Sequence, residues 1–496
     1  MKHRFIYIAL FVFTAIGCNR PPKDLSTAQP IDSLPGLFPD YIGVTVPATI
    51  APLDFAPFPE AASLPESLYA QVTGAQGKAI VVSSRRSKWH GHRYFHFPKK
   101  AWETLLTAHT GDSLTVTVFV RRHGVLYHYK PFPIYVSEAP IDYGLAYRLI
   151  APGYEIYSRM GIYERDLSSY TQTPVFENTL MKETCVNCHA VNRGDPASFS
   201  MHLRGAHGGT VLRQTTLEVI NPRTPESISN CVYPYWHPLG RYIAYSNNNT
   251  QQLFPMHAQR RVEVYDTASD VVVYDTQTHT LLRHEALCTS DFETFPAFSP
   301  DGQYLYFCVA AQQEMPRQYK EVRYNLCRLA FDPGTGTFSG PTDTLLKASA
   351  LGKSLTFPRP SYDGRYVLFT LADYGTFPIW HAEADLGLLD VATGTWRLLD
   401  EVNSADVESY HSWSSNSRWF VFASRRMDGL YTRPYLCAVD AHGRIGKPFL
   451  LPQKDPQAYY ARGMFSFNIP EFITAPISLD AREVVHKALT QPQPNT

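Results

Sequence analysis

Five consecutive residues carry the clearest chemistry in this chain. Cys185-Val186-Asn187-Cys188-His189 has the spacing C-x-x-C-H, in which two thiols are followed shortly by an imidazole. This pattern is typical of covalent c-type haem attachment, because both thiols form thioether bonds to one porphyrin and the imidazole binds its iron. The motif therefore predicts one covalent haem c, attached through Cys185 and Cys188 and ligated by His189.

Other residues near the motif complete the predicted haem site. His202 is the predicted second iron ligand, and Met201 is the alternative. Residues 198–203 alternate like a strand, so these two neighbours point to opposite faces and only one can reach the iron. Arg193 and Arg204 are the predicted partners of the haem propionates, because guanidinium groups bind carboxylates through paired hydrogen bonds.

The same cysteines allow a different metal. Cys185, Cys188, His202 and His207 follow the spacing C-x2-C-x13-H-x4-H, which lies within the range of structural zinc sites. Zinc gives no role to His189, and the glycines around the two histidines do not suit the helix that carries such histidines in zinc fingers. A redox-active dithiol and a structural disulfide are two further alternatives for the cysteine pair.

The N-terminus predicts export and membrane anchoring. Residues 2–4 are basic, and residues 5–16 are apolar but too few for a membrane-spanning helix. Ala15-Ile16-Gly17-Cys18 follows and resembles a bacterial lipoprotein signal, with Ala15 where leucine is usual. The resemblance implies a signal peptide over residues 1–18, a lipid on Cys18 and a place in the bacterial cell envelope, in the periplasm or at the outer-membrane surface. An ordinary cleaved signal peptide is the alternative.

Composition limits the other partners and the fold class. Basic and acidic residues number 45 each, so no basic excess is present to neutralise nucleic-acid phosphates. The 31 tyrosines, 28 phenylalanines and 38 prolines favour many short strands joined by turns. Cys308 and Cys327 lie in neighbouring predicted strands, where either a disulfide or two buried thiols would fit. Polar, proline-rich residues 19–37 predict a flexible tether.

The second part of the chain contains an internal repeat. Each copy has a turn centred on Asp-Gly or a relative of it, followed by a strand that is apolar on both faces. The four clearest copies are residues 236–245, 298–307, 360–369 and 413–422. These segments resemble the repeats of TolB-like, WD40-like β-propellers.

The resemblance implies an all-β protein. A six-bladed propeller is expected over residues 141–480, with the haem motif inserted in an early blade, and residues 155–178 are expected to close the ring against residues 462–475. Residues 38–140 are predicted to form a separate immunoglobulin-like β-sandwich. Residues 481–496 form the predicted C-terminal tail.

Motif and repeats together resemble a group of uncharacterised bacterial envelope proteins. The matching parts are residues 185–189, 199–209 and 233–246. The predicted function is electron transfer by a lipid-anchored c-type cytochrome with an envelope protein as partner. The alternatives are a protein- or glycan-binding scaffold in which haem or zinc is structural, and a single-haem peroxidase. A hydrolase is not favoured, because the chain has no G-x-S-x-G nucleophile motif.

Overall fold

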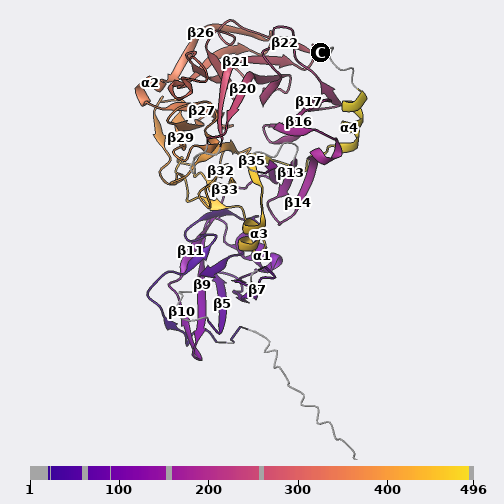
Figure 1. The fold of residues 1–496 in the computed structure, drawn as a ribbon. Coiled ribbons are helices and arrows are strands. Elements are labelled where there is room, and N and C mark those ends of the chain that lie inside the picture. Colours follow the sequence, from indigo (N-terminus) through magenta and orange to yellow (C-terminus); the bar gives the residue numbers. More distant parts are fainter. Residues whose placement is uncertain are drawn as a thin grey trace, which may run out of the picture.

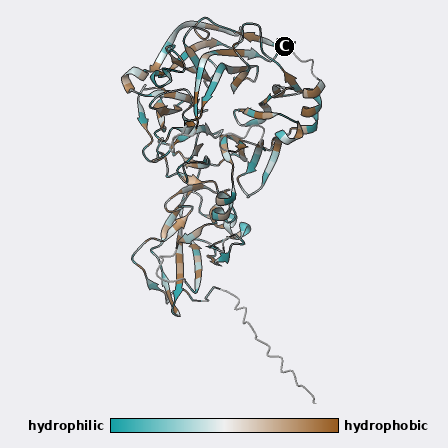
Figure 2. Cartoon of the chain, viewed as in Figure 1, coloured by the Kyte–Doolittle hydropathy of each residue, from teal (hydrophilic) through white to brown (hydrophobic). Residues whose placement is uncertain are grey.

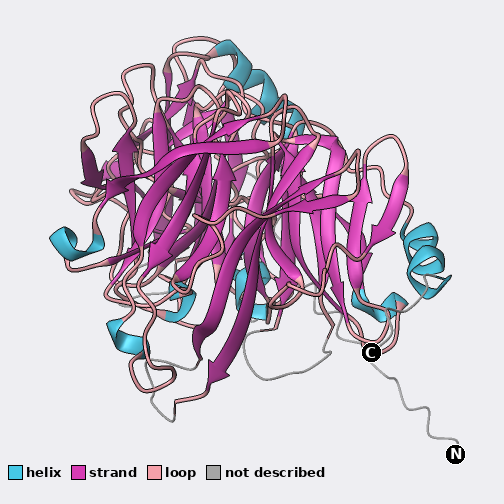
Figure 3. Ribbon diagram, turned by 90° about the horizontal axis from the view of Figure 1, so that it is seen from above, coloured by secondary structure: helices cyan, strands magenta, loops and turns pink. Residues whose placement is uncertain are grey.

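The protein is described by a computed structural model that covers residues 21–22, 24–58, 65–89, 91–151, 159–255 and 262–490. It consists mainly of strands, which gather in a ring of sheets with the N-terminal region attached at one side (Figure 1). Seen from above, the few helices lie around the strands (Figure 3). No helix within the described ranges is long and apolar enough to cross a membrane. Cys18 and the predicted signal peptide lie outside the described residues.

The N-terminal region is built on one sheet of seven strands. Residues 29–30 already pair with this sheet, so the predicted tether over residues 19–37 extends too far. The seven strands are β1 (Gln29–Pro30), β3 (Thr45–Pro47), β5 (Ser67–Thr73), β6 (Ile80–Ser83), β9 (Ser113–Arg122), β10 (Val125–His128) and β11 (Phe132–Ser137). Two small ribbons accompany it, β2 (Gly36–Phe38) with β4 (Ala56–Phe58) and β7 (Arg85–Arg86) with β8 (Arg93–Tyr94).

The predicted immunoglobulin-like sandwich is therefore wrong for this region as far as the structure describes it. An immunoglobulin domain packs two large sheets together, whereas here helix α1 (Lys99–Ala108) packs with the single large sheet. Trp102, Leu105 and Leu106 of α1 belong to the same buried cluster as the sheet residues Val116 and Val118. The helix thus supplies apolar surface that a second sheet would otherwise provide.

The rest of the chain forms the ring. Four sheets have four strands each, in the orders β14-β13-β12-β35, β15-β16-β17-β18, β27-β28-β29-β30 and β31-β32-β33-β34. Their strands are β12 (Gly144–Ile150), β13 (Gly161–Asp166), β14 (Gln172–Glu177), β15 (Cys185–Asn192), β16 (Asp195–Arg204), β17 (Gly209–Arg213), β18 (Leu217–Ile220), β27 (Ser354–Pro360), β28 (Tyr366–Ala372), β29 (Asp385–Asp390), β30 (Trp396–Leu398), β31 (Glu408–Trp413), β32 (Trp419–Ser424), β33 (Arg433–Ala438), β34 (Phe449–Leu450) and β35 (Ser466–Ile473).

A further sheet has eight strands, so the prediction of six separate blade sheets is corrected. Its strands are β19 (Cys231–Trp236), β20 (Tyr242–Leu253), β21 (Glu263–Asp275), β22 (Thr280–Leu282), β23 (Phe292–Phe298), β24 (Tyr304–Ala310), β25 (Asn325–Asp332) and β26 (Thr337–Leu346). It consists of two successive four-stranded runs, β19 to β22 and β23 to β26. The two runs are joined by the parallel pairing of Ser269 with Phe292. β20 and β21, with 12 and 13 residues, are longer than the other strands of the ring.

Six strands surround the ring axis and are here called the inner strands: β15, β19, β23, β27, β31 and β35. Each contacts the next, and β35 contacts β15, so the inner strands form a closed cycle. Hydrophobic residues lie along the strands of both regions (Figure 2). The short helices are α2 (Ala348–Leu351), α3 (Pro456–Arg462) and α4 (Ala481–Thr490), with single 3-10 turns at Asn178–Leu180, Tyr319–Glu321 and Pro378–Trp380.

Two ends of the chain differ from the sequence prediction in detail. Residues 161–177 and 466–473 share one sheet, as predicted for ring closure, but β12 lies between them. Residues 481–490 of the predicted tail form α4, which buries Val484 and Ala488 and contacts β18. The last segment described is therefore packed on the ring.

Ring closure depends on a close approach at Gly144. A Cβ atom at this position would lie against the carbonyl oxygen of Arg165 on the neighbouring strand β13. We expect Gly144→Ala to destabilise the protein by about 1–3 kcal/mol, because the closing sheet must shift to accept one methyl group. Chemical denaturation measures the effect. Gly36→Ala is the matched control, since its Cβ would have no neighbour closer than 3.5 Å, and equal losses for both variants would contradict the argument.

Cys308 and Cys327 do not form a disulfide, since both thiols are free. Cys327 lies opposite Phe307 in the register of β24 and β25. Consecutive side chains of a strand point to opposite faces, so Cys308 and Cys327 lie on different faces and belong to different buried clusters. Both are buried apolar side chains, which was the other alternative.

Candidate functional site: the cavity at the ring axis

Each inner strand carries the same local irregularity. One residue per strand has a positive φ, between 43° and 53°, and the strand pairing skips at this point. These residues are Cys188, Tyr233, Phe295, Phe357, Tyr410 and Ile469. The next residue is always proline or histidine: His189, Pro234, Pro296, Pro358, His411 and Pro470. Cys188-His189 therefore occupies the position that Tyr-Pro or Phe-Pro occupies in other inner strands, as a β-bulge.

The bulge residues meet around the axis. Tyr233 and Phe295 have ring centroids 4.8 Å apart, Phe295 and Phe357 4.3 Å, and Phe357 and Tyr410 5.1 Å. Cys188 lies next to Tyr233 and Tyr410 and is a much smaller member of this set. We call the six bulge residues the axial ring. Its gap at Cys188 leaves space that an aromatic side chain would fill.

A cavity of about 1160 Å³ opens beside this gap. Cys185 and Cys188 both line it, so the two thiols of the motif face one space. The cavity exceeds the roughly 300–1,000 Å³ of ordinary small-molecule sites. The aromatic part of its wall comprises Tyr233, Phe254, Phe377, Trp380 and Tyr410.

The cavity is also strongly cationic. Arg148, Arg204 and Arg425 line it, and no aspartate or glutamate does so within the described residues. Nη2 of Arg148 lies 3.4 Å from the Cys185 sulfur and 3.4 Å from the Met160 sulfur. The guanidinium of Arg425 stacks on Trp380 at 3.4 Å from the ring centroid. Three positive charges without a carboxylate favour an anionic occupant.

Burial controls the state of the Cys188 thiol. It raises the pKa of Cys188, and the nearby Arg204 and Arg148 lower it in part. Neither Cys185 nor Cys188 is in a disulfide. The structure therefore presents two separate thiols, of which Cys185 is the more exposed.

The predicted iron ligands do not line this cavity. His189 is buried at 2% exposure, and burial lowers its pKa to about 4. Neither of its ring nitrogens has a hydrogen-bond partner, and Nε2 lies 3.9 Å from Oε2 of Glu471. The imidazole follows Cys188 in the bulge and lies behind the cavity wall rather than on it.

His202 and Met201 also lie away from the cavity. His202 sits opposite Asn187 on β16, with Nδ1 3.3 Å from the Thr210 hydroxyl, and burial lowers its pKa to about 3. Met201 points to the other face, into a buried apolar cluster. Among the described residues, Met160 is the one methionine on the cavity wall, and no histidine is found there. The sequence did not point to Met160, because it is 25 residues before Cys185 and is brought beside it by the contact of β13 with β15.

The zinc alternative finds no assembled site. Within the described residues, no three His, Cys, Asp or Glu side chains lie close enough to hold a metal ion, and this includes Cys185, Cys188, His202 and His207. The reason is the strand geometry, because consecutive residues of β15 and β16 point to alternate faces instead of converging.

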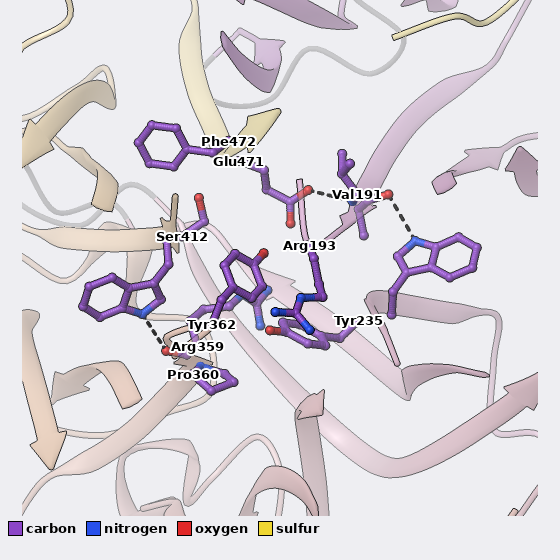
Figure 4. Close-up of a pocket in the computed structure, with 12 residues that line it drawn as sticks. Val191, Arg193, Tyr235, Arg359, Pro360, Tyr362, Ser412, Glu471 and Phe472 are labelled. Atoms are coloured by element: carbon purple, nitrogen blue, oxygen red, sulfur yellow. Dashed lines mark hydrogen bonds between the residues drawn. The ribbon is translucent and has the colours of Figure 1, made fainter. Parts of the chain in front are cut away.

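The two predicted propionate partners are separated. Arg204 lines the cavity with the cysteines. Arg193 lies beyond the axial ring, in a small pocket of about 30 Å³ at the other end of the inner strands (Figure 4). Arg193 therefore does not belong to the same site as the thiols.

Comparisons with known proteins describe only a distant similarity. No protein-family model and no curated protein matches the chain. Among solved structures, a DUF4784 family protein from Bacteroides caccae is 9% identical, with 74% of this chain and 95% of that chain covered and a TM-score of 0.31. A puromycin-hydrolysing peptidase from Mycobacterium tuberculosis is 12% identical over 68% of this chain and 52% of that chain, with a TM-score of 0.33.

The dihydro-haem d1 dehydrogenase NirN is 12% identical, with 82% of this chain and 80% of that chain covered and a TM-score of 0.30. These scores are too low to support an inference about activity. The propeller-like arrangement is instead established by the strand pairing and by the closed cycle of inner strands.

Proposed function

We propose that this chain is a lipid-anchored cell-envelope protein that carries one covalent c-type haem in the axial cavity and exchanges electrons with an envelope partner. The observation that carries the proposal is that Cys185 and Cys188 face one large cavity, which three arginines and no carboxylate of the described residues line. If each run of the eight-stranded sheet is counted as one blade, the number of blades agrees with the six that the resemblance to TolB-like repeats implies.

The thiols and the cavity suit a haem in size and charge. A c-type haem is flat, apolar across its ring and anionic at its two propionates. Tyr233, Tyr410 and Trp380 offer apolar surface, and Arg148 and Arg204 are cations near the thiols. Bound haem would supply an iron centre that takes up and releases one electron. The residues of this chain would attach it, orient it and limit its contact with water.

His189 is the motif residue whose position does not yet suit coordination. Its imidazole lies behind the bulge, while a ligand must reach into the cavity. Both ring nitrogens are buried without a hydrogen bond, which is costly for polar groups. Turning the ring toward the cavity would exchange its contacts with the backbone of Ala146 and Ile469 for a bond from one ring nitrogen to the metal. Met160 is the sulfur available on the cavity wall.

Covalent haem is tested by expressing the full chain together with c-type maturation machinery. We expect one haem per chain in a pyridine haemochrome spectrum of the denatured, washed protein. The double variant Cys185→Ala/Cys188→Ala should lose all of it, because no thioether bond can form. Cys231→Ala is the matched control, since Cys231 is a buried cysteine that does not line the cavity.

The other outcomes separate the alternative functions. Wild-type protein without covalent haem but with one zinc per chain would overturn the haem proposal in favour of a structural metal. No metal, together with reversible binding of anionic ligands, would favour the scaffold alternative. If haem is present, rapid turnover of hydrogen peroxide would identify a peroxidase, whereas a reversible redox titration without turnover supports electron transfer.

A further inference from the structure

A second site lies at the end of the ring axis opposite the cysteine cavity. Along the inner strands, the cavity residues come first, the axial ring follows, and a small pocket comes last. We call this pocket the axial pit. It is lined by residues of β15, β19, β27, β31 and β35 and by the turns that follow β15 and β27. Five of the six inner strands therefore build one site.

The pit contains two guanidinium groups and one carboxyl group. Arg193 and Arg359 both line it and form no ion pair with any carboxylate of the described residues. Arg193 lies over the ring of Tyr362 at 5.4 Å, and Arg359 lies over Tyr235 at 5.2 Å. Stacking on a tyrosine fixes the plane of each guanidinium and leaves its N–H edge free.

Most of these N–H donors meet no protein acceptor. Arg193 donates one hydrogen bond, to the carbonyl of Pro300 at 3.4 Å, and Arg359 donates one, to the carbonyl of Pro358 at 3.2 Å. Each guanidinium has five N–H donors. The two side chains thus leave a set of charged donors directed at a small space between different blades.

The carboxyl of Glu471 completes the pit without neutralising it. One of its oxygens accepts a hydrogen bond from the backbone N–H of Val191 at 3.1 Å, and the group points toward Arg193 and Tyr362 (Figure 4). It makes no ion pair with Arg193 or Arg359. A single carboxyl group faces two guanidinium groups in the pit, so it cannot offset both of their charges.

We propose that the axial pit binds a carboxylate group between Arg193 and Arg359. A carboxylate is planar and matches the paired N–H donors of a guanidinium. The free volume of about 30 Å³ admits a group of only a few atoms. The ligand is therefore a small organic acid, or the end of a peptide with a free terminal carboxylate, of which the pit contacts only the head group.

The test uses the full chain and two probes, acetate and a short peptide with a free C-terminus, each titrated by calorimetry. We expect saturable binding that weakens at least tenfold in Arg359→Ala and in Arg193→Ala, because each removes charged hydrogen bonds. Arg193 is exposed, so its variant should fold even if Arg359→Ala does not. Arg223→Ala is the control, since Arg223 is exposed and lies outside the pit.

The two probes distinguish a small organic acid from a peptide end as the source of the carboxylate. Binding of the peptide but not of its C-terminal amide or of acetate identifies a peptide end, whereas binding of acetate alone identifies a small acid. Absence of saturable binding by both probes overturns the proposal, as does equal affinity of the Arg193 and Arg359 variants and wild type. Because the thiol cavity is not involved, the outcome is independent of haem attachment.

Discussion

Cys188→Phe is expected to abolish haem attachment completely while leaving the ring folded. The substitution restores the residue type that Phe295 and Phe357 have at the same position of their strands. Their φ values are 51° and 53°, against 47° for Cys188, so the backbone already suits an aromatic residue. A phenylalanine would fill the gap in the axial ring and remove one thiol, so a haem would lose both the space it needs and one of its two attachment points. Haem-stained gels and a haemochrome spectrum measure the loss.

Cys188→Ala separates the two effects. It removes the thiol but keeps the gap, so a single thioether through Cys185 can still form, and some covalent haem should remain. The melting temperature of the phenylalanine variant should equal or exceed that of Cys188→Ala, because the aromatic ring adds buried contacts. Retention of wild-type haem in Cys188→Phe would show that the haem is not attached in this cavity.

Trp419→Ala is expected to cause the largest loss of stability. The side chain is fully buried, and its indole Nε1–H donates to the carbonyl of Pro140 at 2.9 Å. Trp419 thereby joins the sheet of β31–β34 to the segment that leads from the N-terminal region into β12. Removing a buried indole leaves a cavity, so the free energy of unfolding should fall by about 3–5 kcal/mol. Chemical denaturation monitored by fluorescence measures it.

Two further variants control this prediction. Trp419→Phe keeps most of the buried volume but loses the hydrogen bond, and we expect it to cost about 1 kcal/mol plus a small packing term. Leu239→Ala changes an apolar residue that is 76% exposed, and it should change the free energy of unfolding by less than about 0.5 kcal/mol. A loss for Trp419→Ala no greater than for Leu239→Ala would contradict the proposed role of the indole.

The local patterns of the chain determined the class of fold and the location of the candidate thiols. Asp-Gly turns such as Asp301-Gly302 and Asp363-Gly364 specify short hairpins through their immediate neighbours. Their repetition was sufficient to predict stacked antiparallel sheets in a ring. The C-x-x-C-H spacing likewise placed two thiols within one strand, and the structure directs both into one cavity.

The sequence contains a second repeat at the bulges of the inner strands. An apolar or aromatic residue followed by proline recurs in four inner strands. Three of these pairs precede the turn of their sheet, and the fourth lies in the strand that closes the ring: Tyr233-Pro234, Phe295-Pro296, Phe357-Pro358 and Ile469-Pro470. Cys188-His189 stands at the same position of its own inner strand as these pairs do in theirs. Cys188 therefore takes the place at the axis that an aromatic residue has in most of the other inner strands.

Only the tertiary structure decided which residues share a site with the thiols. Met160 and Arg148 reach Cys185 because β12 pairs with β13 and both strands contact β15 of the next sheet. Arg193, only five residues after Cys188, is carried to the opposite end of the axis because a strand rises about 3.3 Å per residue. Cys185 and Cys188 are three residues apart and would lie on opposite faces of a regular strand, but both line the cavity because a β-bulge resets the alternation of side chains between them. Bulge register and ring closure are set by packing between strands that are distant in sequence, so local spacing alone does not specify them.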